Sequence, residues 1–577
     1  MRCGGPPLEV ARQFTAHHSS FNITLALFKP PSAGKLRRPC LPSWTRLLTL
    51  IAFAFPHSLD PNRRLLWWLL PPILLLLALF GGRWLYAAAH AHAEGERQAA
   101  ERAAAARIER DETARAAAVL AQKRETLEVL GLGLVVEKFR NAQVWEAIQK
   151  VERDPFASIL PTEPEVVAGE LVRGQRTGKR ASDTHEYAMR YFVEKIPLPG
   201  IVIFPKPTGK DPELWESGAG TLMNSRGAFT LFITAEQIYA DDPDEALGKI
   251  FEFFDAHPDV PAVYVITGDG YMIHKRLMDP SPSDINGDPG WKPGDPTEAM
   301  AAFVLVRRDR VNRLIRPFAV DEAFGLDYDD QTSYVNRVWN FFFSLKKRHA
   351  DSALPTVAEW LAEVPTLMEA GRHVPVSSLM PFWERRSGFV PSPWIPVPWT
   401  KWQLKEFDEL PTLGYLHRPQ YASYRQADGQ PLGERHRPAA FAAAWRAALD
   451  TLPAGRTPVR LFFDAGGVSI RGRGIPPMAN AFATHHPDTD WDLGSPRMID
   501  LSARLDDTGA ASPFVQIALA VIASYRDGDV SATVNLRRAE GASILMVSPP
   551  SAPPEARKPH PGAGQDPFKV PLAPAFP

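Results

Sequence analysis

The chain has 577 residues, a net charge of −1, 45% hydrophobic residues and 23% charged residues. These proportions are ordinary for a globular protein and exclude a chain that is disordered throughout. The near-neutral charge disfavours a nucleic-acid binder, because such proteins usually carry an excess of lysine and arginine. The two cysteines, Cys3 and Cys40, precede the body of the protein, so we expect neither a disulfide nor a cysteine-based zinc site there.

An apolar segment near the N-terminus predicts a membrane span. Residues 65–82 contain no charged side chain, and a helix of that length covers about 27 Å, close to the thickness of a bilayer core. Aromatic residues that suit the membrane interface stand near its ends, at Trp67, Trp68, Trp84 and Tyr86. We therefore predict a single-pass transmembrane helix over residues 65–86.

Other interpretations of this region remain open. Small residues at 87–91 follow the apolar run, as the cleavage site of a signal peptide requires, and a buried core helix is a further alternative. Residues 1–64 have the composition of a low-order segment, and the next methionine after Met1 is Met189, so a start at another codon downstream of Met1 is also open. More basic residues precede the span than follow it, a slight bias that favours a body on the far, periplasmic side of the membrane.

Helical and strand patterns alternate along the rest of the chain. Residues 87–126 are rich in Ala, Arg and Glu and lack an apolar heptad, so we expect a solvated helical stalk rather than a coiled coil. Strand patterns lie at residues 200–204, 229–234, 262–267, 303–307, 459–463, 498–505, 532–536 and 543–547. Helical patterns separate several of these strands, and this alternation predicts an α/β fold.

Two parts of the body share a pattern. An amphipathic helix with its apolar stripe at residues 247–254 precedes a strand that ends at Asp269, and a second stripe at residues 441–448 precedes a strand that ends at Asp464. We therefore expect two α/β lobes in series. Internal duplication and chance both remain open as the cause, because helix-to-strand units of this kind are common.

A segment rich in Pro, Gly and Asp separates the two lobes, and a Pro-rich tail follows the second. The predicted organisation is a low-order segment at 1–64, a transmembrane helix at 65–86, a helical stalk at 87–126, an N-terminal lobe at 127–280, a linker at 281–297, a C-terminal lobe at 298–549 and a disordered tail at 550–577.

The chain carries no strong catalytic motif. It has neither the G-x-S-x-G of hydrolases nor the H-E-x-x-H of metalloproteases, so we expect no catalytic residue, no cofactor and no metal. Asp269 and Asp464 offer an alternative, because ligands of open α/β sheets bind beyond the strand ends that these acids occupy. In an enzyme or a small-ligand-binding protein, both carboxylates would face one ligand site. An Asp near a glycine after a strand is also a common way to form a turn.

A segment rich in tryptophan and proline, residues 382–402, is the first candidate for protein recognition. Its tryptophans are Trp383, Trp394, Trp399 and Trp402. Aromatic side chains on a proline-stiffened segment give a large contact area with little loss of entropy, which suits partner binding. The alternative is that these tryptophans pack on the core of the protein itself.

Several segments resemble the bacterial type VI secretion lipase-adaptor family. They are VLGLGLVVEKFRNAQVWEAIQ at residues 129–149, PLPGIVIFP, AVYVITGDG and FVLVRRDRV. The resemblance covers roughly residues 127–549, as an N-terminal and a C-terminal adaptor domain. It implies a non-enzymatic adaptor or chaperone, without catalytic residues, that binds a phospholipase toxin and helps load it onto the secretion spike protein.

The resemblance also bears on location. The apolar segment predicts a single-pass protein of the bacterial inner membrane. The resemblance implies that its body faces the cytoplasm, where spikes are loaded, whereas the basic residues favour the periplasmic side. Three functions therefore remain open at the level of sequence: the adaptor, an enzyme or ligand-binding protein that uses Asp269 and Asp464, and a structural envelope protein whose stalk sets a distance from the membrane.

Overall fold

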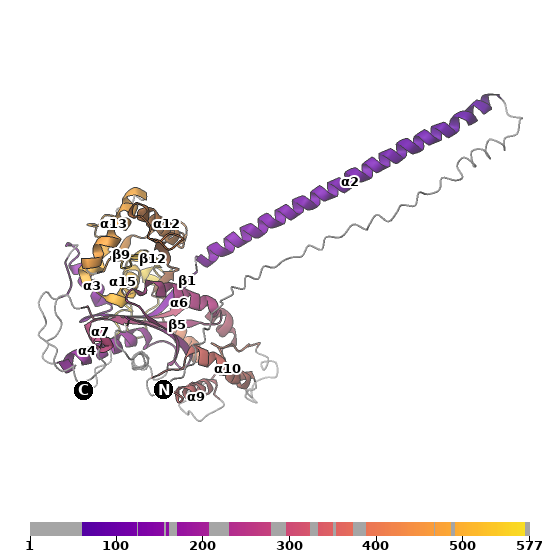
Figure 1. Cartoon of the computed structure of the whole chain (residues 1–577). Helices are drawn as coiled ribbons and strands as arrows, with labels where there is room; N and C mark the ends of the chain where they lie inside the picture. The colour runs from indigo at the N-terminus through magenta and orange to yellow at the C-terminus, as the bar shows by residue number, and fades with distance from the viewer. Residues whose placement is uncertain are drawn as a thin grey trace, which may run out of the picture. The chain divides into compact units, whose positions relative to one another are not determined.

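The computed structural model describes most of the chain (Figure 1). The described residues are 61–123, 125–154, 157–160, 170–206, 230–278, 296–322, 333–349, 353–372, 388–466, 468–485 and 491–571. The chain falls into two units, Met1–Arg110 and Asp111–Pro577. Most of the predicted low-order segment 1–64 and most of the predicted linker 281–297 lie outside the described residues.

One long helix, α2 (Pro61–Lys123), contains both the predicted membrane span and the predicted stalk. Its segment Leu70–Ile108 is long and apolar enough to cross a membrane. The large side chains of this segment are exposed, as Phe80 shows at 71% of full exposure. An exposed apolar surface of this kind suits a bilayer, and a membrane helix tolerates the internal Pro71 and Pro72.

The described strands of the body form a single twelve-stranded mixed sheet, which confirms the α/β class. The N-terminal half contributes β1 (Thr126–Val136), β2 (Phe139–Arg140), β3 (Pro197–Phe204), β4 (Leu231–Tyr239), β5 (Ala262–Asp269) and β6 (Ala299–Val306). The C-terminal half contributes β7 (Gly414–His417), β8 (Gln420–Ser423), β9 (Arg460–Asp464), β10 (Met498–Asp500), β11 (Ser531–Asn535) and β12 (Gly541–Ser548). The order is β10-β9-β11-β12-β7-β1-β6-β5-β3-β4, with β2 beside β1 and β8 beside β12.

The two halves of the sheet have the same internal order. Each half contains three parallel strands, β4-β3-β5 or β10-β9-β11, then an antiparallel strand, β6 or β12, and then β1 or β7. The strands β1 and β7 pair antiparallel where the halves meet. In this order β3 occupies the same position in its half as β9 does in the other, and β5 the same position as β11. The sequence pattern instead paired β5, which ends at Asp269, with β9, which ends at Asp464. That match was wrong, because helix-to-strand units recur throughout α/β proteins and do not identify a repeat.

Helices connect the strands and cover the sheet. They are α3 (Ala142–Lys150), α4 (Glu170–Met189), α6 (Ala246–Ala256), α7 (Tyr271–Met278), α9 (Tyr334–Lys346), α10 (Val357–Arg372), α11 (Lys401–Glu409), α12 (Arg437–Leu449), α13 (Val468–His485), α14 (Leu501–Leu505) and α15 (Ser512–Asp527). Shorter helical turns are η1 (Pro243–Glu245), α8 (Arg308–Arg310), η3 (Val311–Ile315), η4 (Arg316–Phe318), η5 (Glu434–His436), η6 (Gly509–Ala511) and η7 (Pro554–Ala556). In Figure 1, α12 and α13 lie together at the top of the body, and α9 and α10 lie at its lower right.

Helix α15 lies at the centre of the core. Every residue from Ser512 to Tyr525 is buried, so this part of the helix has no face toward solvent. The helix contacts β1 and β6 of the N-terminal half and β7, β9, β11 and β12 of the C-terminal half. Its end is set by Gly528, which adopts a left-handed conformation with φ 80°. The two halves therefore share the larger hydrophobic cluster, and a second cluster lies within the C-terminal half.

The C-terminal segment differs from its prediction. The sequence predicts a disordered tail over residues 550–577, but residues 551–571 pack against the body. Phe568 and Val570 are buried there, and the ring of Phe568 meets Tyr525 edge to face with centroids 5.3 Å apart. A high proline content predicts disorder, but it does not show that a few apolar side chains of the segment can pack on the body. The prediction of a disordered tail was therefore wrong for residues 551–571.

Two glycines in β1 allow helix α4 to approach the sheet closely. A Cβ atom on Gly131 would lie 2.0 Å from the carbonyl oxygen of Ala188, and one on Gly133 would lie 1.9 Å from that of Thr184. Any larger residue would push the helix away from the strand, so glycine is required at both positions.

We expect Gly133→Ala to destabilise the protein by about 1–3 kcal/mol or more, because the added methyl group overpacks a rigid backbone contact. Gly178→Ala in the same helix is the matched control: a Cβ atom there meets nothing within 4 Å, and alanine favours the helix, so stability should stay equal or rise. Thermal unfolding of the full-length protein in detergent measures both changes. Equal melting temperatures for the two variants would contradict the close contact.

Candidate partner-binding groove

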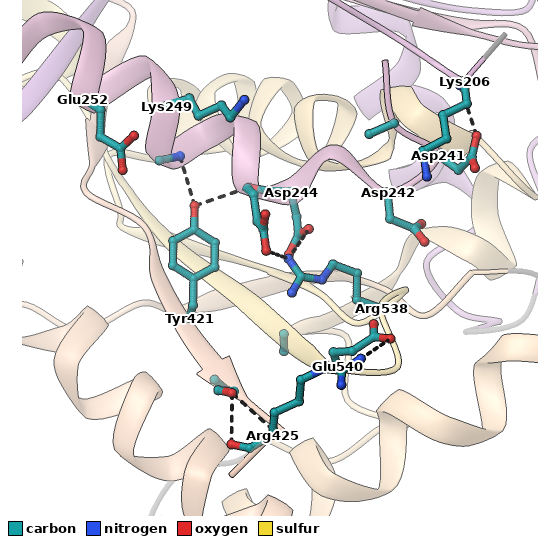
Figure 2. A pocket seen from close by; sticks show the side chains of 16 residues that line it. Lys206, Asp241, Asp242, Asp244, Lys249, Glu252, Tyr421, Arg425, Arg538 and Glu540 are labelled. Atoms are coloured by element: carbon teal, nitrogen blue, oxygen red, sulfur yellow. Dashed lines mark hydrogen bonds and ion pairs between the residues drawn. The ribbon is translucent and has the colours of Figure 1, made fainter. Parts of the chain in front are cut away.

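A groove of about 840 Å³ lies where the two halves of the body meet. One wall comes from the residues after β4 and from η1 and α6 in the N-terminal half (Figure 2). The opposite wall comes from β8 and from the turn between β11 and β12 in the C-terminal half. We call this feature the junction groove.

The N-terminal wall follows from the amphipathic helix that the sequence predicts. The buried apolar stripe of α6 consists of Leu247, Ile250, Phe251 and Phe254, which confirms the stripe expected at residues 247–254. Because this face is packed on the core, Lys249 and Glu252 are left on the side of the groove, where both are exposed (Figure 2).

Tyr421 connects the two walls of the groove. Its hydroxyl oxygen accepts a hydrogen bond from the backbone N–H of Gly248 at 2.9 Å, and the hydroxyl donates to the carbonyl oxygen of Asp244 at 3.4 Å. The residue nevertheless remains 42% exposed. An aromatic ring that is fixed at one end and open at its side offers a partner a rigid contact at little entropic cost.

One carboxylate of the groove is buried against an arginine. Asp244 is 1% exposed, and Nη1 of Arg538 lies 3.2 Å from its Oδ1. Burial raises the pKa of Asp244 to about 6, an effect that the neighbouring guanidinium of Arg538 only partly offsets. The same guanidinium pairs with Glu245, so Arg538 joins the C-terminal half to the η1 turn of the N-terminal half.

The preceding residue, Arg537, makes a second ionic connection between the halves. Its guanidinium lies 2.9 Å from Asp242, 2.8 Å from Asp507 and 3.5 Å from Asp464. Burial by itself lowers the pKa of Arg537, but the three carboxylates outweigh this and hold the pKa above its ordinary value. The wall of the groove is thus fixed by buried charges whose separation would leave an uncompensated ion.

The junction groove has a surplus of negative charge. Its carboxylates belong to Asp241, Asp242, Asp244, Glu245, Glu252 and Glu540, against the cationic side chains of Lys206, Lys249, Arg425 and Arg538. Within the described part of the chain, the exposed carboxylates of Asp241 and Glu252 form no ion pair. Lysine or arginine side chains of a partner are the groups that such carboxylates attract.

The two strand-end acids each bind a residue at or just before the start of α15. Oδ2 of Asp269 accepts a hydrogen bond from the backbone N–H of Ala510 at 2.5 Å, and its Oδ1 lies 2.7 Å from Nε2 of His274. Asp464 accepts a hydrogen bond from the hydroxyl of Ser512. Both acids are 1% exposed, and neither lines the junction groove. Their contacts order the segment that begins the buried helix.

Among the residues that the structure describes, no group of three His, Cys, Asp or Glu side chains is arranged to hold a metal ion.

Two of the four tryptophans proposed for partner contact are buried. Trp394 is 1% exposed and Trp399 is 4% exposed, and Trp394 stacks on Trp360 with ring centroids 6.4 Å apart. These two side chains hold their segment on the body and offer no surface to a partner, which corrects the expectation for them. Trp402 is partly exposed, and Trp383 lies outside the described residues.

No pattern in the sequence predicted the junction groove. Tyr421 and Gly248, which join its walls, are separated by 173 positions in the chain. The one local signal was the acidic run at residues 241–245, which marks a helix start and carries several carboxylates on neighbouring positions.

Comparison with known protein families identifies both halves of the body. Residues 125–287 match the family description "type VI lipase adapter protein Tla3, N-terminal", and residues 413–549 match "type VI lipase adapter protein Tla3, C-terminal". Together the matches cover more than half of the chain. The first contains the η1–α6 wall of the groove, and the second contains β8 and β12.

Solved structures with similarity to the chain include ketosynthases. The ishigamide ketosynthase/chain length factor is 11% identical with a TM-score of 0.36, and the match covers 74% of this chain and 99% of that one. The ketosynthase from module 1 of the bacillaene synthase of Bacillus amyloliquefaciens is 8% identical with a TM-score of 0.39, and the match covers 75% of this chain and 74% of that one. Similarity at this level carries no argument about what the chain does.

We expect Asp244→Asn to gain stability relative to the wild type as the pH rises from about 4 to about 7. The pKa of Asp244 is raised from 3.8 to about 6 in the folded protein, so folding favours the protonated carboxyl and stability falls as this group ionises. Asparagine does not ionise and lacks this penalty. Melting temperatures of both proteins at the two pH values measure the effect, and a difference that is independent of pH would contradict it.

Proposed function

The chain belongs to the type VI lipase adapter family, and we propose that it is a non-enzymatic adapter that binds a phospholipase effector and helps load it onto the secretion spike. The observation that carries this proposal is the match of the two family domains to the two halves of the body. These halves are joined by the pairing of β1 with β7 and share the larger hydrophobic cluster, so they present one continuous surface to a partner.

We further propose that the junction groove is the main docking site of the effector. Its two walls come from the two matched regions, so the groove exists only where both family domains are assembled. The half-exposed ring of Tyr421 supplies an anchoring contact, and the carboxylates of Asp241 and Glu252 select a segment of the effector that carries lysine or arginine.

The proposed adapter is anchored in the bacterial inner membrane by α2. The exposed helical segment Leu70–Ile108, which contains a stretch long and apolar enough to cross a membrane, supports this part of the proposal. An anchored adapter would restrict effector capture to the membrane surface, close to the site where a secretion apparatus assembles. Loading onto the spike requires the body to face the cytoplasm.

The alternative function, an enzyme or ligand-binding protein built on Asp269 and Asp464, has less support. The two carboxylates are buried and hydrogen-bonded to the backbone of residue 510 and to Ser512. Acids that are used in this way hold a helix start in place and are not presented to a substrate.

We expect the full-length chain to co-purify with its phospholipase effector when the two are expressed together, and Glu252→Lys to weaken this binding roughly tenfold by reversing a charge that faces the partner. Glu555→Lys is the matched control, because Glu555 is exposed, acidic and outside the groove. Affinities of the detergent-solubilised proteins measure both. Absence of any binding by the wild type would contradict the adapter role, and equal weakening by the two variants would contradict docking in the groove.

We expect the full-length chain to sediment with bacterial membranes and to resist extraction at high salt, because an apolar helix is held by the bilayer and not by charge. Deletion of residues 65–86 should release the body into the supernatant. A reporter that is active only in the cytoplasm should be active when it is fused after Pro577. A deletion variant that still sediments, or a reporter active only in the periplasm, would contradict the proposed anchor or its orientation.

A further inference from the structure

Strand β8 has a free edge beside the junction groove. It pairs antiparallel with β12 and with no other strand among the described residues. Tyr421, Ala422 and Ser423 of this strand line the groove. Figure 2 shows the side chain of Tyr421 pointing from β8 toward the start of α6, where its hydroxyl meets Gly248. The free edge therefore belongs to the same site at which we have placed the partner.

The pairing with β12 shows which backbone groups of β8 face the free edge. The N–H group of Tyr424, just after β8, donates to the carbonyl oxygen of Glu540 at 2.7 Å, so Tyr424 faces β12. Successive residues of an antiparallel strand direct their N–H and C=O groups to opposite edges. Ala422 therefore also faces β12, and the N–H and C=O groups of Tyr421 and Ser423 face away from it.

The free edge of β8 is open to another chain. Within the described residues, the backbone groups of Tyr421 and Ser423 have no hydrogen-bond partner on the side away from β12. Both residues are exposed. Edge strands that accept no further strand are usually blocked by a charged residue, a proline or a bulge. The sequence of β8, QYAS, contains neither a charge nor a proline, and its pairing with β12 has no bulge.

The surroundings of this edge favour a basic segment as the added strand. The exposed carboxylates of Asp241 and Glu252 line the same groove and form no ion pair within the described part of the chain. Because side chains along a strand point alternately to its two faces, every second residue of an added strand would lie on the side of Tyr421. Lysine or arginine there would meet the carboxylates. A second copy of this chain would instead bring two acidic grooves together.

We infer that the phospholipase effector docks by strand addition. An extended segment of the effector pairs with the free edge of β8 through the N–H and C=O groups of Tyr421 and Ser423, and it carries lysine or arginine on the residues that face the groove. This inference rests on the proposed adapter function and specifies how the effector is held in the groove. Main-chain hydrogen bonds supply affinity, and the alternating basic side chains supply selectivity.

Two proline variants of the full-length protein in detergent test this inference. Ser423→Pro removes an N–H group from the free edge, at a position where an edge strand tolerates proline. It should weaken binding of the effector about 10- to 100-fold, because the partner loses a main-chain donor and meets the proline ring. Melting temperatures of the variants show whether they are folded.

Ala454→Pro is the matched control. Ala454 is exposed and lies outside the groove. The carbonyl oxygen of Pro453 accepts a hydrogen bond from the N–H group of Arg456 at 3.1 Å, so Ala454 takes the second position of a turn, which favours proline. This variant should bind the effector with unchanged affinity.

A second measurement needs no variant of the protein. Short overlapping peptides that span the effector sequence are tested for binding to the wild type, and a peptide that binds is remade with one N-methyl group at each position in turn. Because only every second N–H group of an added strand faces β8, N-methylation should weaken binding about tenfold or more at alternate positions and have little effect between them.

The outcomes separate this inference from the proposed function. Strand addition would be overturned by equal affinities of Ser423→Pro and the wild type, by equal weakening in both proline variants, by the absence of a binding peptide, or by an N-methyl scan without a period of two. A wild-type dimer that Ser423→Pro dissociates would show that β8 pairs with a second copy instead. Failure of the wild type to bind the intact effector would overturn the adapter role itself.

Discussion

The antiparallel pairing of β1 with β6 on one side and with β7 on the other determines the arrangement of the whole body. Every residue of β1 after Thr126 is buried, and a shift of one residue would turn each side chain to the opposite face of the sheet. The strand therefore fixes the register of one half against the other. That register brings Tyr421 to Gly248 at the junction groove, and Arg504 to the end of α3.

Buried and partly buried arginines then hold the two halves in this arrangement. Arg537 and Arg538 follow β11 and reach acids of the N-terminal half, and Arg504 binds three carbonyl oxygens after α3. A buried ion pair adds little net stability, but loss of one partner leaves an uncompensated charge at a cost of about 3–5 kcal/mol. The junction resists distortion, so a protein partner meets a preformed surface and little of its binding energy is lost to ordering that surface.

Local patterns in the sequence predicted elements but not their assembly. The stripe at residues 247–254 and the strand ending at Asp269 lie where expected, because hydrophobic periodicity reports helix and strand directly. The tryptophans Trp394 and Trp399 turned out to be buried, because a pattern does not show whether an aromatic ring on a proline-rich segment faces inward. The contacts of Tyr421 with Gly248 and of Arg504 with Val151 join residues separated by 173 and 353 positions, and no local pattern contains such contacts.

We propose that this protein acts by binding a phospholipase effector across the junction between its two halves. Hydrogen–deuterium exchange of the full-length protein, with and without the effector, shows whether that junction is covered in the complex. We expect slower exchange on complex formation at residues 241–252 and 421–425, with little change in helices α9 and α10, which do not line the groove. Slower exchange confined to α9 and α10, or none in the body while the effector is bound, would contradict it.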